Sequence, residues 1–185
     1  MSNPANMLEF FHLLENLKTI KRTGWIYSNV PNPESIADHM YRMSIMAMSI
    51  EDTTVDKIRC VKMALVHDIA ESIAGDITPH DKVTKSEKYK LEFDSIQKIK
   101  SLFNKDSSFS EEMESLWLEY EECATPEARL VKNLDLFEMV CQAFEYEKKH
   151  DIDLSQFFTS TRHKFTHPVV ISWVNEIYAQ RTIKL

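Results

Sequence analysis

His67 and Asp68 interrupt an apolar segment of the chain, Leu65-Val-His-Asp-Ile-Ala-Glu71. An imidazole and a carboxylate that are buried without partners cost free energy, so such a segment needs a reason to keep both. In a helix, Glu71 lies one turn beyond them, at i+4 from His67 and i+3 from Asp68, so the three side chains share one patch. Asp76 follows directly after Gly75, where a loop can bend its carboxylate back over that patch. These residues could bind a cation and move protons beside it.

A cation needs more ligands than one helix supplies, and two other apolar segments each carry a suitable side chain. His39 lies among methionines and isoleucines, and Asp135 lies inside an apolar helical stripe. Together with His67 and Asp68 they form a set of two imidazoles and two carboxylates without a thiolate. Such a set suits Mn²⁺, Co²⁺, Fe²⁺ or Zn²⁺ and leaves positions for water and substrate. The sequence therefore predicts a hydrolytic metal centre at His39, His67, Asp68 and Asp135.

The spacing of apolar residues predicts the helices that have to position these ligands. Ser35 is expected to cap the helix of His39, and Gly75 to end the helix of His67 and Asp68. Thr125-Pro126 is expected to begin the long helix of Asp135. The apolar faces of the three helices are expected at Ile36, Met40, Met43, Ala47 and Ile50, at Ile58, Val61, Leu65 and Ile69, and at Leu130, Leu134, Phe137, Cys141 and Phe144.

The rest of the chain has helical signals of its own. Capping boxes are expected at Thr84–Glu87 and at Ser108–Glu111, and Pro168 is expected to begin the last helix. The prolines around residues 31–33 end a first amphipathic helix. The apolar faces of these helices are expected at Leu8, Phe11, Leu14, Leu17 and Ile20, at Tyr89, Phe93, Ile96 and Phe103, at Met113, Leu116, Trp117 and Tyr120, and at Val170, Trp173, Val174 and Ile177.

The composition fits one all-α domain over residues 1–185, with its metal-binding core at about 35–140. Only two glycines occur in 185 residues, whereas sheet proteins need many glycines for their turns. The net charge of −7 argues against a nucleic-acid partner, which would call for a basic face. Three cysteines without CxxC spacing argue against a disulfide framework. No apolar run reaches membrane-spanning length, so no membrane partner is expected. The cytoplasm is the default location, and the nucleus stays open.

The order His, His-Asp, Asp resembles the signature of the HD-domain phosphohydrolases. A larger set of motifs is similar to the eukaryotic branch of the HD-domain-containing 5′-deoxynucleotidase family, and the resemblance runs from about Leu8 to about Pro168. It implies a single helical HD domain. The motifs are Arg22-Thr-Gly-Trp25, Pro33-Glu-Ser35, Asp38-His-Met-Tyr-Arg-Met43, His67-Asp-Ile-Ala-Glu71, Gly75-Asp76 and Val131-Lys-Asn-Leu-Asp135.

The resemblance implies removal of phosphate from deoxyribonucleoside 5′-monophosphates by a homodimer that favours Mn²⁺ or Co²⁺, with Mg²⁺, Fe²⁺ and Zn²⁺ left open. It implies His39, His67, Asp68 and Asp135 as ligands of the first cation. Glu71, Asp76 and the Ile77 carbonyl are implied as candidate ligands of a second cation in the eukaryotic branch. In the bacterial branch, the positions of Glu71 and Asp76 are instead catalytic or face the substrate.

The same resemblance implies substrate contacts. An arginine like Arg22 holds the phosphate, and the tryptophan after it packs on the sugar. In this chain Thr23 and Gly24 separate Arg22 from Trp25, which weakens the second assignment.

The residues themselves favour one phosphate and a deoxyribose. Arg22 and a nearby cation can neutralise a single phosphate, and Lys82 and Lys85 are the only neighbouring lysines that a longer phosphate tail could use. The sugar is expected to meet the loop Asp76-Ile77-Thr78-Pro79, where a crowded wall would disfavour a 2′-hydroxyl. The alternatives are another HD-type phosphohydrolase (a phosphodiesterase or a nucleoside triphosphatase) and a non-catalytic nucleotide-binding protein.

A homodimer also follows from the amount of apolar surface. The chain has nine methionines, and Trp117, Tyr120 and Phe157 look exposed in the sequence pattern. A small monomer would not easily bury all of them. We therefore expect two copies related by a two-fold axis.

Overall fold

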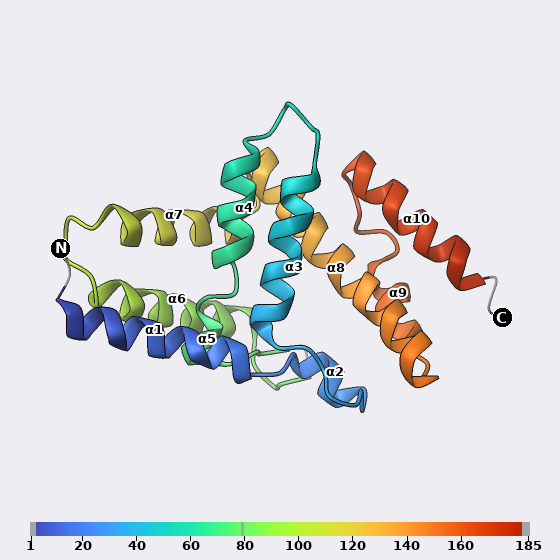
Figure 1. The fold of residues 1–185 in the computed structure, drawn as a ribbon, viewed down its shortest axis with the longest axis horizontal. Helices are drawn as coiled ribbons and strands as arrows, with labels where there is room; N and C mark the ends of the chain where they lie inside the picture. The colour runs from blue at the N-terminus through green and yellow to red at the C-terminus, as the bar shows by residue number, and fades with distance from the viewer. Residues whose placement is uncertain (1–2, 79, 183–185) are drawn as a thin grey trace.

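Ten α-helices and no strand make up the regular structure of the residues that this computed structural model describes, which are 3–78 and 80–182 (Figure 1). The all-α prediction is confirmed. None of these helices has both the length and the apolar character that a membrane span requires. The helices are α1 Pro4–Thr19, α2 Thr23–Tyr27, α3 Ile36–Ser49, α4 Lys57–Val66, α5 Glu71–Ala74, α6 Lys85–Ser101, α7 Ser108–Glu122, α8 Pro126–His150, α9 Ser155–Thr161 and α10 Pro168–Thr182.

Local capping chemistry sets several of the helix starts. Ser35 and Asp38 form a reciprocal capping box at the start of α3, and Thr84 caps α6 in the same way with Glu87. The Thr125 side chain accepts a hydrogen bond from the Ala128 amide, with proline at the first position of α8. These predicted starts are confirmed, as is the start of α10 at Pro168. The cap of α7 is Ser107, which accepts from the Ser110 amide, so the capping box predicted at Ser108–Glu111 is wrong.

Helices α3, α4 and α8 pack against one another at the centre of the molecule. On one side, α1 contacts α3 and α5, while α6 contacts α5 and α7. On the other side, α9 and α10 both pack on α8. Figure 1 shows α1 and α10 at opposite ends of the long axis, with the central helices between them. Residues that project from α3, α4 and α8 toward their common centre therefore meet in the middle of the molecule.

The buried apolar side chains form two clusters. The large core is built around Met43, Ala47, Met63 and Leu134, and it extends to α10. The small core gathers Ile36, Met40, Ile69, Ile96 and Trp117, and it extends to α1. Helix α3 contributes Met40 to the small core and Met43 to the large core, and Val66, next to His67, packs against both cores. The polar site therefore lies where the two cores meet.

Some of the predicted apolar faces are wrong. In α4, Ile58 and Leu65 are 64% and 49% exposed, whereas Cys60, Met63 and Ala64 are fully buried. In α1, Leu8 and Phe11 are more than half exposed. Both helices carry apolar residues on more than one face, so their spacing allows two orientations. Contact with α3 and α8 decides between them in α4. The short helices α2 and α9 were not predicted.

Candidate metal centre and active site

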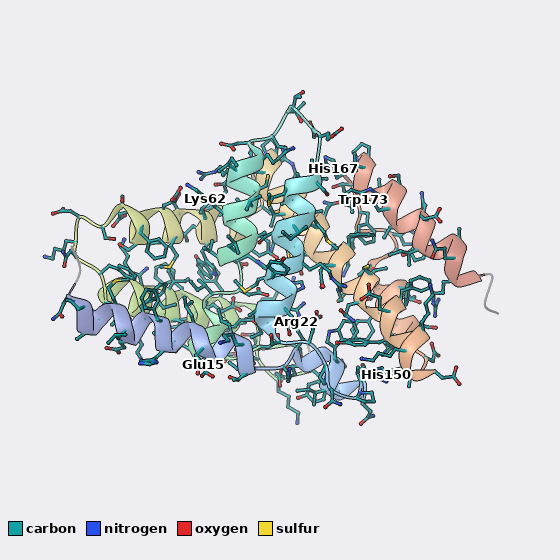
Figure 2. The ribbon with its side chains drawn as sticks, viewed as in Figure 1. Glu15, Arg22, Lys62, His150, His167 and Trp173 are labelled. Atoms are coloured by element: carbon teal, nitrogen blue, oxygen red, sulfur yellow. The ribbon has the colours of Figure 1, made fainter. Side chains whose placement is uncertain are left out.

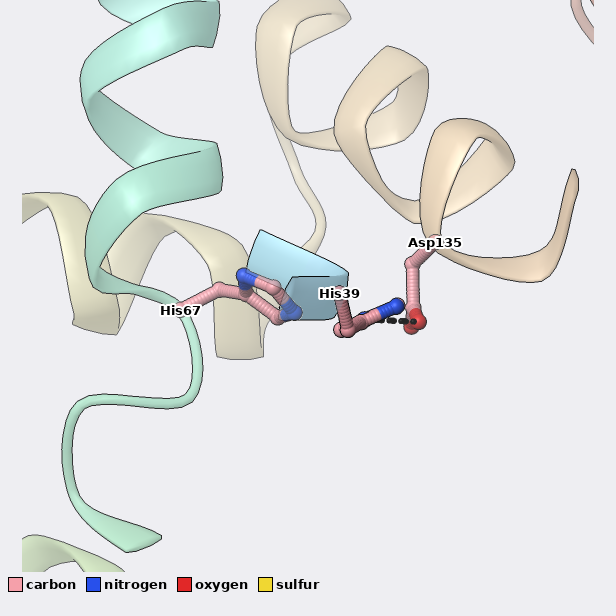
Figure 3. A group of neighbouring side chains, drawn as sticks. All are labelled: His39, His67 and Asp135. Atoms are coloured by element: carbon pink, nitrogen blue, oxygen red, sulfur yellow. Dashed lines mark ion pairs between the residues drawn. The ribbon is translucent and has the colours of Figure 1, made fainter. Parts of the chain in front are cut away.

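The four predicted metal ligands meet at the junction of α3, α4 and α8. His39 Nε2 lies 3.3 Å from Asp135 Oδ1 and 3.9 Å from Asp68 Oδ2. His67 Nε2 lies 3.2 Å from the same Asp68 oxygen. One ligand atom from each of His39, His67 and Asp135 falls within 4.8 Å of the others. Figure 3 shows His39, Asp135 on α8 and His67 on the segment after α4 converging on one another.

The predicted ligands His67 and Asp68 lie just beyond the end of a helix, not inside one. Helix α4 ends at Val66, so the prediction of a continuous helix up to Gly75 is wrong. In residues 67–70 the backbone bonds tighten to i+3 spacing: the Ile69 amide donates to the Val66 carbonyl and the Glu71 amide to the Asp68 carbonyl, each at 3.0 Å. The negative end of the α4 dipole therefore lies at the ligands, where it favours a cation.

In each of the two histidines, one ring nitrogen is placed to bind a cation. Their side chains are 0% and 1% exposed, and Nε2 of each is buried and makes no hydrogen bond to the described residues. Buried polar atoms are rarely left in this state, because an unmade hydrogen bond costs free energy. The opposite ring nitrogens are both engaged: Nδ1 of His67 lies 3.0 Å from the Ala64 carbonyl and Nδ1 of His39 lies 2.5 Å from Glu138. Both Nε2 atoms are thus directed at the two aspartates, as a divalent cation requires.

The charges of these residues also favour binding of a divalent cation. Burial on its own would raise the pKa of Asp68 and of Asp135, but the two histidines and Arg22 hold both below the usual range. Burial and Arg22 lower the pKa of His39, but Glu138 and Asp135 outweigh them and raise it to about 9. Two ionised carboxylates therefore face imidazoles that attract positive charge. A divalent cation would replace the proton on His39.

Arg22 stands beside the ligand cluster. Its Nη1 donates to Asp68 Oδ2 at 3.3 Å, and its side chain is 17% exposed. An isolated β-bridge between Lys21 and Ser35 fixes the backbone here, and the Arg22 amide donates to the Glu34 carbonyl at 3.1 Å. Figure 2 shows Arg22 close to the N-terminal end of α3. A guanidinium held in this position can contact an anion at the metal centre.

Glu71 has the surroundings of a proton carrier. The residue is 3% exposed, and its Oε2 makes no hydrogen bond to the described residues. Burial, then Asp68 and Asp76, raise the pKa of Glu71 well above its usual value, against the opposing charges of Arg22 and Lys88. A carboxyl group of this kind exchanges protons nearer to neutral pH than an exposed one does.

The loop after Gly75 is tied to its neighbours. Asp76 Oδ2 accepts from the Thr23 amide at 2.5 Å, and the Asp76 carbonyl accepts from the Thr23 hydroxyl at 2.9 Å. Lys88 Nζ donates to the Ile77 carbonyl at 2.9 Å. Thr78 donates to Asp81 through its amide and its hydroxyl, at 2.8 and 2.9 Å. Pro79, also predicted to line the sugar site, lies outside the described residues. Among the candidate ligands of a second cation, Glu71 is the one with a buried side-chain oxygen that has no partner in the described chain.

Trp25 lies in the core. Its ring is 2% exposed, it packs against Tyr146 and Phe157, and its Nε1 donates to Glu34 Oε1 at 2.8 Å. The expected sugar contact is therefore corrected, because the ring presents no face to a ligand.

The sequence did not predict the residues that hydrogen-bond to the proposed ligands on the side away from the cation. Tyr120 donates to Asp135 Oδ2 at 2.8 Å, and its ring packs on His67. Glu138 contacts His39 and is fully buried. One signal was available: Glu138 lies four residues after Leu134 on the apolar face of α8, where a carboxylate is out of place. Tyr120 gave no such signal, since an aromatic residue is ordinary in an apolar stripe.

Residues 14–171 match the sequence profile of the HD domain family. A protein from Danio rerio named 5′-deoxynucleotidase HDDC2 is 48% identical over 95% of this chain and 88% of its own length. A protein of the same name from Dictyostelium discoideum is 46% identical over 96% of this chain and 99% of its own length. The crystal structure of the PH0347 protein from Pyrococcus horikoshii OT3 is similar with a TM-score of 0.74, at 30% identity, and the match covers 92% of this chain and 97% of that one.

Proposed function

This chain belongs to the HD domain family, and we propose that it is a metal-dependent 5′-deoxynucleotidase, which releases phosphate from deoxyribonucleoside 5′-monophosphates. The relatives that carry this name match nearly the whole chain. The observation that carries the proposal is the pair of buried histidine Nε2 atoms that make no hydrogen bond to the described residues and lie next to Asp135 and Asp68. Arg22 and the buried Glu71 lie beside them, and a purely structural metal site would need neither.

His39, His67, Asp68 and Asp135 would hold the cation, and we propose Mn²⁺ or Co²⁺ as the preferred ions because the ligand set is mixed nitrogen and oxygen. When bound, the cation supplies Lewis-acid stabilisation of phosphate charge and lowers the pKa of a water at the site. The ion pair between Arg22 and Asp68 keeps the guanidinium next to this position. Its planar fork then orients the phosphate by binding two non-bridging oxygens.

Glu71 and Asp76 take the remaining roles. Water attacks phosphorus, the bond from phosphorus to the 5′-oxygen breaks, and the 5′-oxygen leaves with a proton. Glu71 is the group that orients the water and accepts its proton, which its raised pKa favours. Asp76 lies on the adjoining loop, where it contacts the sugar or protonates the departing oxygen, with Ile77 and Thr78 beside it.

As the alternative to proton transfer by Glu71, we propose that Glu71, Asp76 and Ile77 bind a second, weaker cation. Its weakness follows from the contacts of the loop, because the Ile77 carbonyl first has to release Lys88. Titration of the metal-free protein with Mn²⁺ should therefore give two separate dissociation constants, and Lys88→Met should tighten only the weaker one. A single binding step that Lys88→Met leaves unchanged would count against the second site.

The decisive experiment for the reaction is a comparison of kcat/KM over a matched set of nucleotides at saturating Mn²⁺. Deoxyribonucleoside 5′-monophosphates are expected to be cleaved faster than the ribonucleotide, 3′-phosphate and triphosphate counterparts. Equal rates on ribose and deoxyribose forms would contradict the sugar preference. Faster cleavage of triphosphates would place the chain among the other HD phosphohydrolases.

We also propose a homodimer, on grounds that differ in part from those in the sequence. Trp117 and Tyr120 are 1% and 4% exposed, so they cannot form an interface. Instead Tyr41, Ile45 and Met48 are 66%, 47% and 57% exposed and lie at i, i+4 and i+7 on one face of α3. Light scattering is expected to give twice the chain mass, and Ile45→Glu is expected to lower it. An active monomer at micromolar concentration would exclude the dimer. The cytoplasmic location stays a prediction.

A further inference from the structure

Behind the metal centre, a buried carboxylate connects His39 to an arginine. Glu138 is 0% exposed, and its Oε2 lies 2.5 Å from His39 Nδ1. Its other oxygen, Oε1, accepts from Arg42 Nε at 2.8 Å and lies 2.6 Å from Arg42 Nη2. Arg42 is held in turn by Glu145 at 2.8 Å and by Gln142 at 2.7 Å. Each oxygen of Glu138 therefore has one assigned partner.

The hydrogen-bond donors and acceptors in these contacts determine which ring nitrogen of His39 carries the proton. An ionised carboxylate only accepts hydrogen bonds, so Nδ1 of His39 has to carry the proton. In the neutral imidazole, Nε2 then keeps its lone pair, on the side of Asp135 and Asp68. A guanidinium only donates, and by occupying Oε1 it leaves Oε2 for the imidazole. Arg42 also compensates the charge of a carboxylate that would otherwise be costly to bury.

The two helices that supply the ligands also supply this support. On α3, Arg42 lies one turn after His39, and on α8, Glu138 lies one turn after Asp135. The same packing of α3 on α8 that brings His39 to Asp135 therefore brings Arg42 to Glu138. The support is part of the helix pair and does not depend on any loop.

We infer that Glu138 and Arg42 are positioning residues, which hold His39 as a cation ligand by fixing the proton on Nδ1. The inference rests on the metal centre of the proposed function, and it concerns metal affinity and not turnover. The residues act through His39, and neither contacts the substrate or the cation.

The test is the Mn²⁺ affinity of Glu138→Gln, measured on purified, metal-depleted protein by competition with a fluorescent chelator. Because Arg42 only donates, the amide oxygen of the introduced glutamine is expected to turn to it, so the amide N–H groups face Nδ1 of His39. The proton then moves to Nε2 and blocks the ligand atom. We expect the affinity to fall by about 10- to 100-fold, the range typical of groups that orient metal ligands.

A double variant separates orientation from general damage. In Glu138→Gln combined with Arg42→Met, the amide is no longer tied to the arginine and can turn its oxygen to Nδ1. The double variant is therefore expected to bind Mn²⁺ more tightly than Glu138→Gln alone. A matched control is Glu145→Gln, which loses a bond to the same arginine but does not contact His39. Its affinity should stay within about twofold of wild type, as for an exposed ion pair.

The outcomes are distinct. If Glu138→Gln lowers the unfolding temperature in chelator but leaves the Mn²⁺ affinity unchanged, the role is structural and the inference is overturned. A double variant that binds no better than Glu138→Gln also overturns it. The expected order of affinities supports the inference even if the wild-type protein cleaves no nucleotide, in which case only the proposed reaction fails. A wild-type protein that binds no Mn²⁺ overturns both.

Discussion

At the scale of single residues, neighbouring carboxylates of the site acquire opposite properties from their surroundings. Asp68 contacts His67 and Arg22, which keep its pKa low despite burial. Glu71, three residues later, is buried and its Oε2 makes no hydrogen bond to the described part of the chain. Burial and the negative charges of Asp68 and Asp76 therefore raise its pKa. Divergent pKa values in one site commonly separate a charged group from a proton-transfer group. Asp68 therefore suits a cation ligand and Glu71 suits an acid or base.

This division predicts different losses for two similar substitutions. Glu71→Gln is expected to lower kcat by about 10²- to 10⁴-fold, the usual contribution of a positioned acid or base, while the first equivalent of Mn²⁺ stays bound. Asp68→Asn is expected to lose both turnover and that Mn²⁺. Metal content by elemental analysis, measured with kcat on the same samples, checks both. Loss of the first Mn²⁺ in Glu71→Gln would make Glu71 a primary ligand and refute the division.

A second prediction concerns Glu34. Burial and the charge of Glu138 raise its pKa to about 7 from 4.5, against the opposing effects of His39 and the Trp25 hydrogen bond. The folded protein thus holds this proton more tightly than the unfolded chain. Its contribution to stability is complete below pH 4.5 and is lost as the pH rises through 7. Glu34→Gln should remove this loss.

The measurement is urea unfolding at pH 5 and pH 8 in the presence of chelator. Relative to wild type, Glu34→Gln is expected to gain on the order of 1 to 3 kcal/mol at pH 8 compared with pH 5. Gln can still accept the Trp25 hydrogen bond, so the packing is retained. The exposed Glu145→Gln serves as a control without such a gain. An equal effect of Glu34→Gln at both pH values would show that the carboxyl titrates normally.

At the scale of elements, the break between α4 and α5 determines where three side chains of the proposed site lie. Helix α4 ends at Val66, so the proposed ligands His67 and Asp68 lie at its C-terminal end, and α5 begins with Glu71. Gly75 closes α5 with φ 77° and ψ 168°, a conformation that is essentially restricted to glycine. The direction of the Asp76–Thr78 loop follows from this one backbone conformation.

Gly75→Ala should therefore be costly although no atom blocks the added carbon. A Cβ at Gly75 would meet nothing within 4 Å, so the penalty is conformational, about 1 to 3 kcal/mol. Gly24→Ala is the matched control: it lies inside α2, and its Cβ would make ordinary contact with Phe157 at 3.6 Å. Chemical unfolding of both variants checks the difference. Equal stabilities would show that the loop after Gly75 can adopt another path.

The elements also show what the sequence could predict. Capping by Ser35, Thr84 and Thr125 is local chemistry, so those helix starts were predicted correctly. The break at residues 67–70 and the buried face of α4 depend on packing against α3 and α8, which no local pattern contains. The proposed ligands of the first cation could be selected from the sequence because polar residues stand out in apolar segments. Arg42 could not be selected in this way, because charged residues are common on helices and the sequence does not show its contact with Glu138.

At the scale of the whole molecule, the cation should contribute to the stability of the fold. Its proposed ligands come from α3, the end of α4, and α8, so only the folded chain assembles them. Saturating Mn²⁺, at about 1,000 times the dissociation constant, is expected to stabilise the protein by about 4 kcal/mol. His67→Ala should remove this gain, whereas His80→Ala, at an exposed histidine, should retain it. Thermal unfolding with and without Mn²⁺ checks this. A gain that survives in His67→Ala would place the bound ion elsewhere.

The two cores meet near His39, and this boundary should affect the cooperativity of unfolding. Met40 and Met43 both follow His39 along α3 and belong to the small core and the large core respectively, while Val66 packs against both. Their shared boundary is polar, and it holds together best when a cation neutralises it. Ion occupancy should then govern cooperativity: with Mn²⁺ the calorimetric and van't Hoff enthalpies of unfolding are expected to agree. In chelator, the two cores are expected to unfold separately. The number of unfolding transitions in calorimetry should therefore depend on whether the cation is bound.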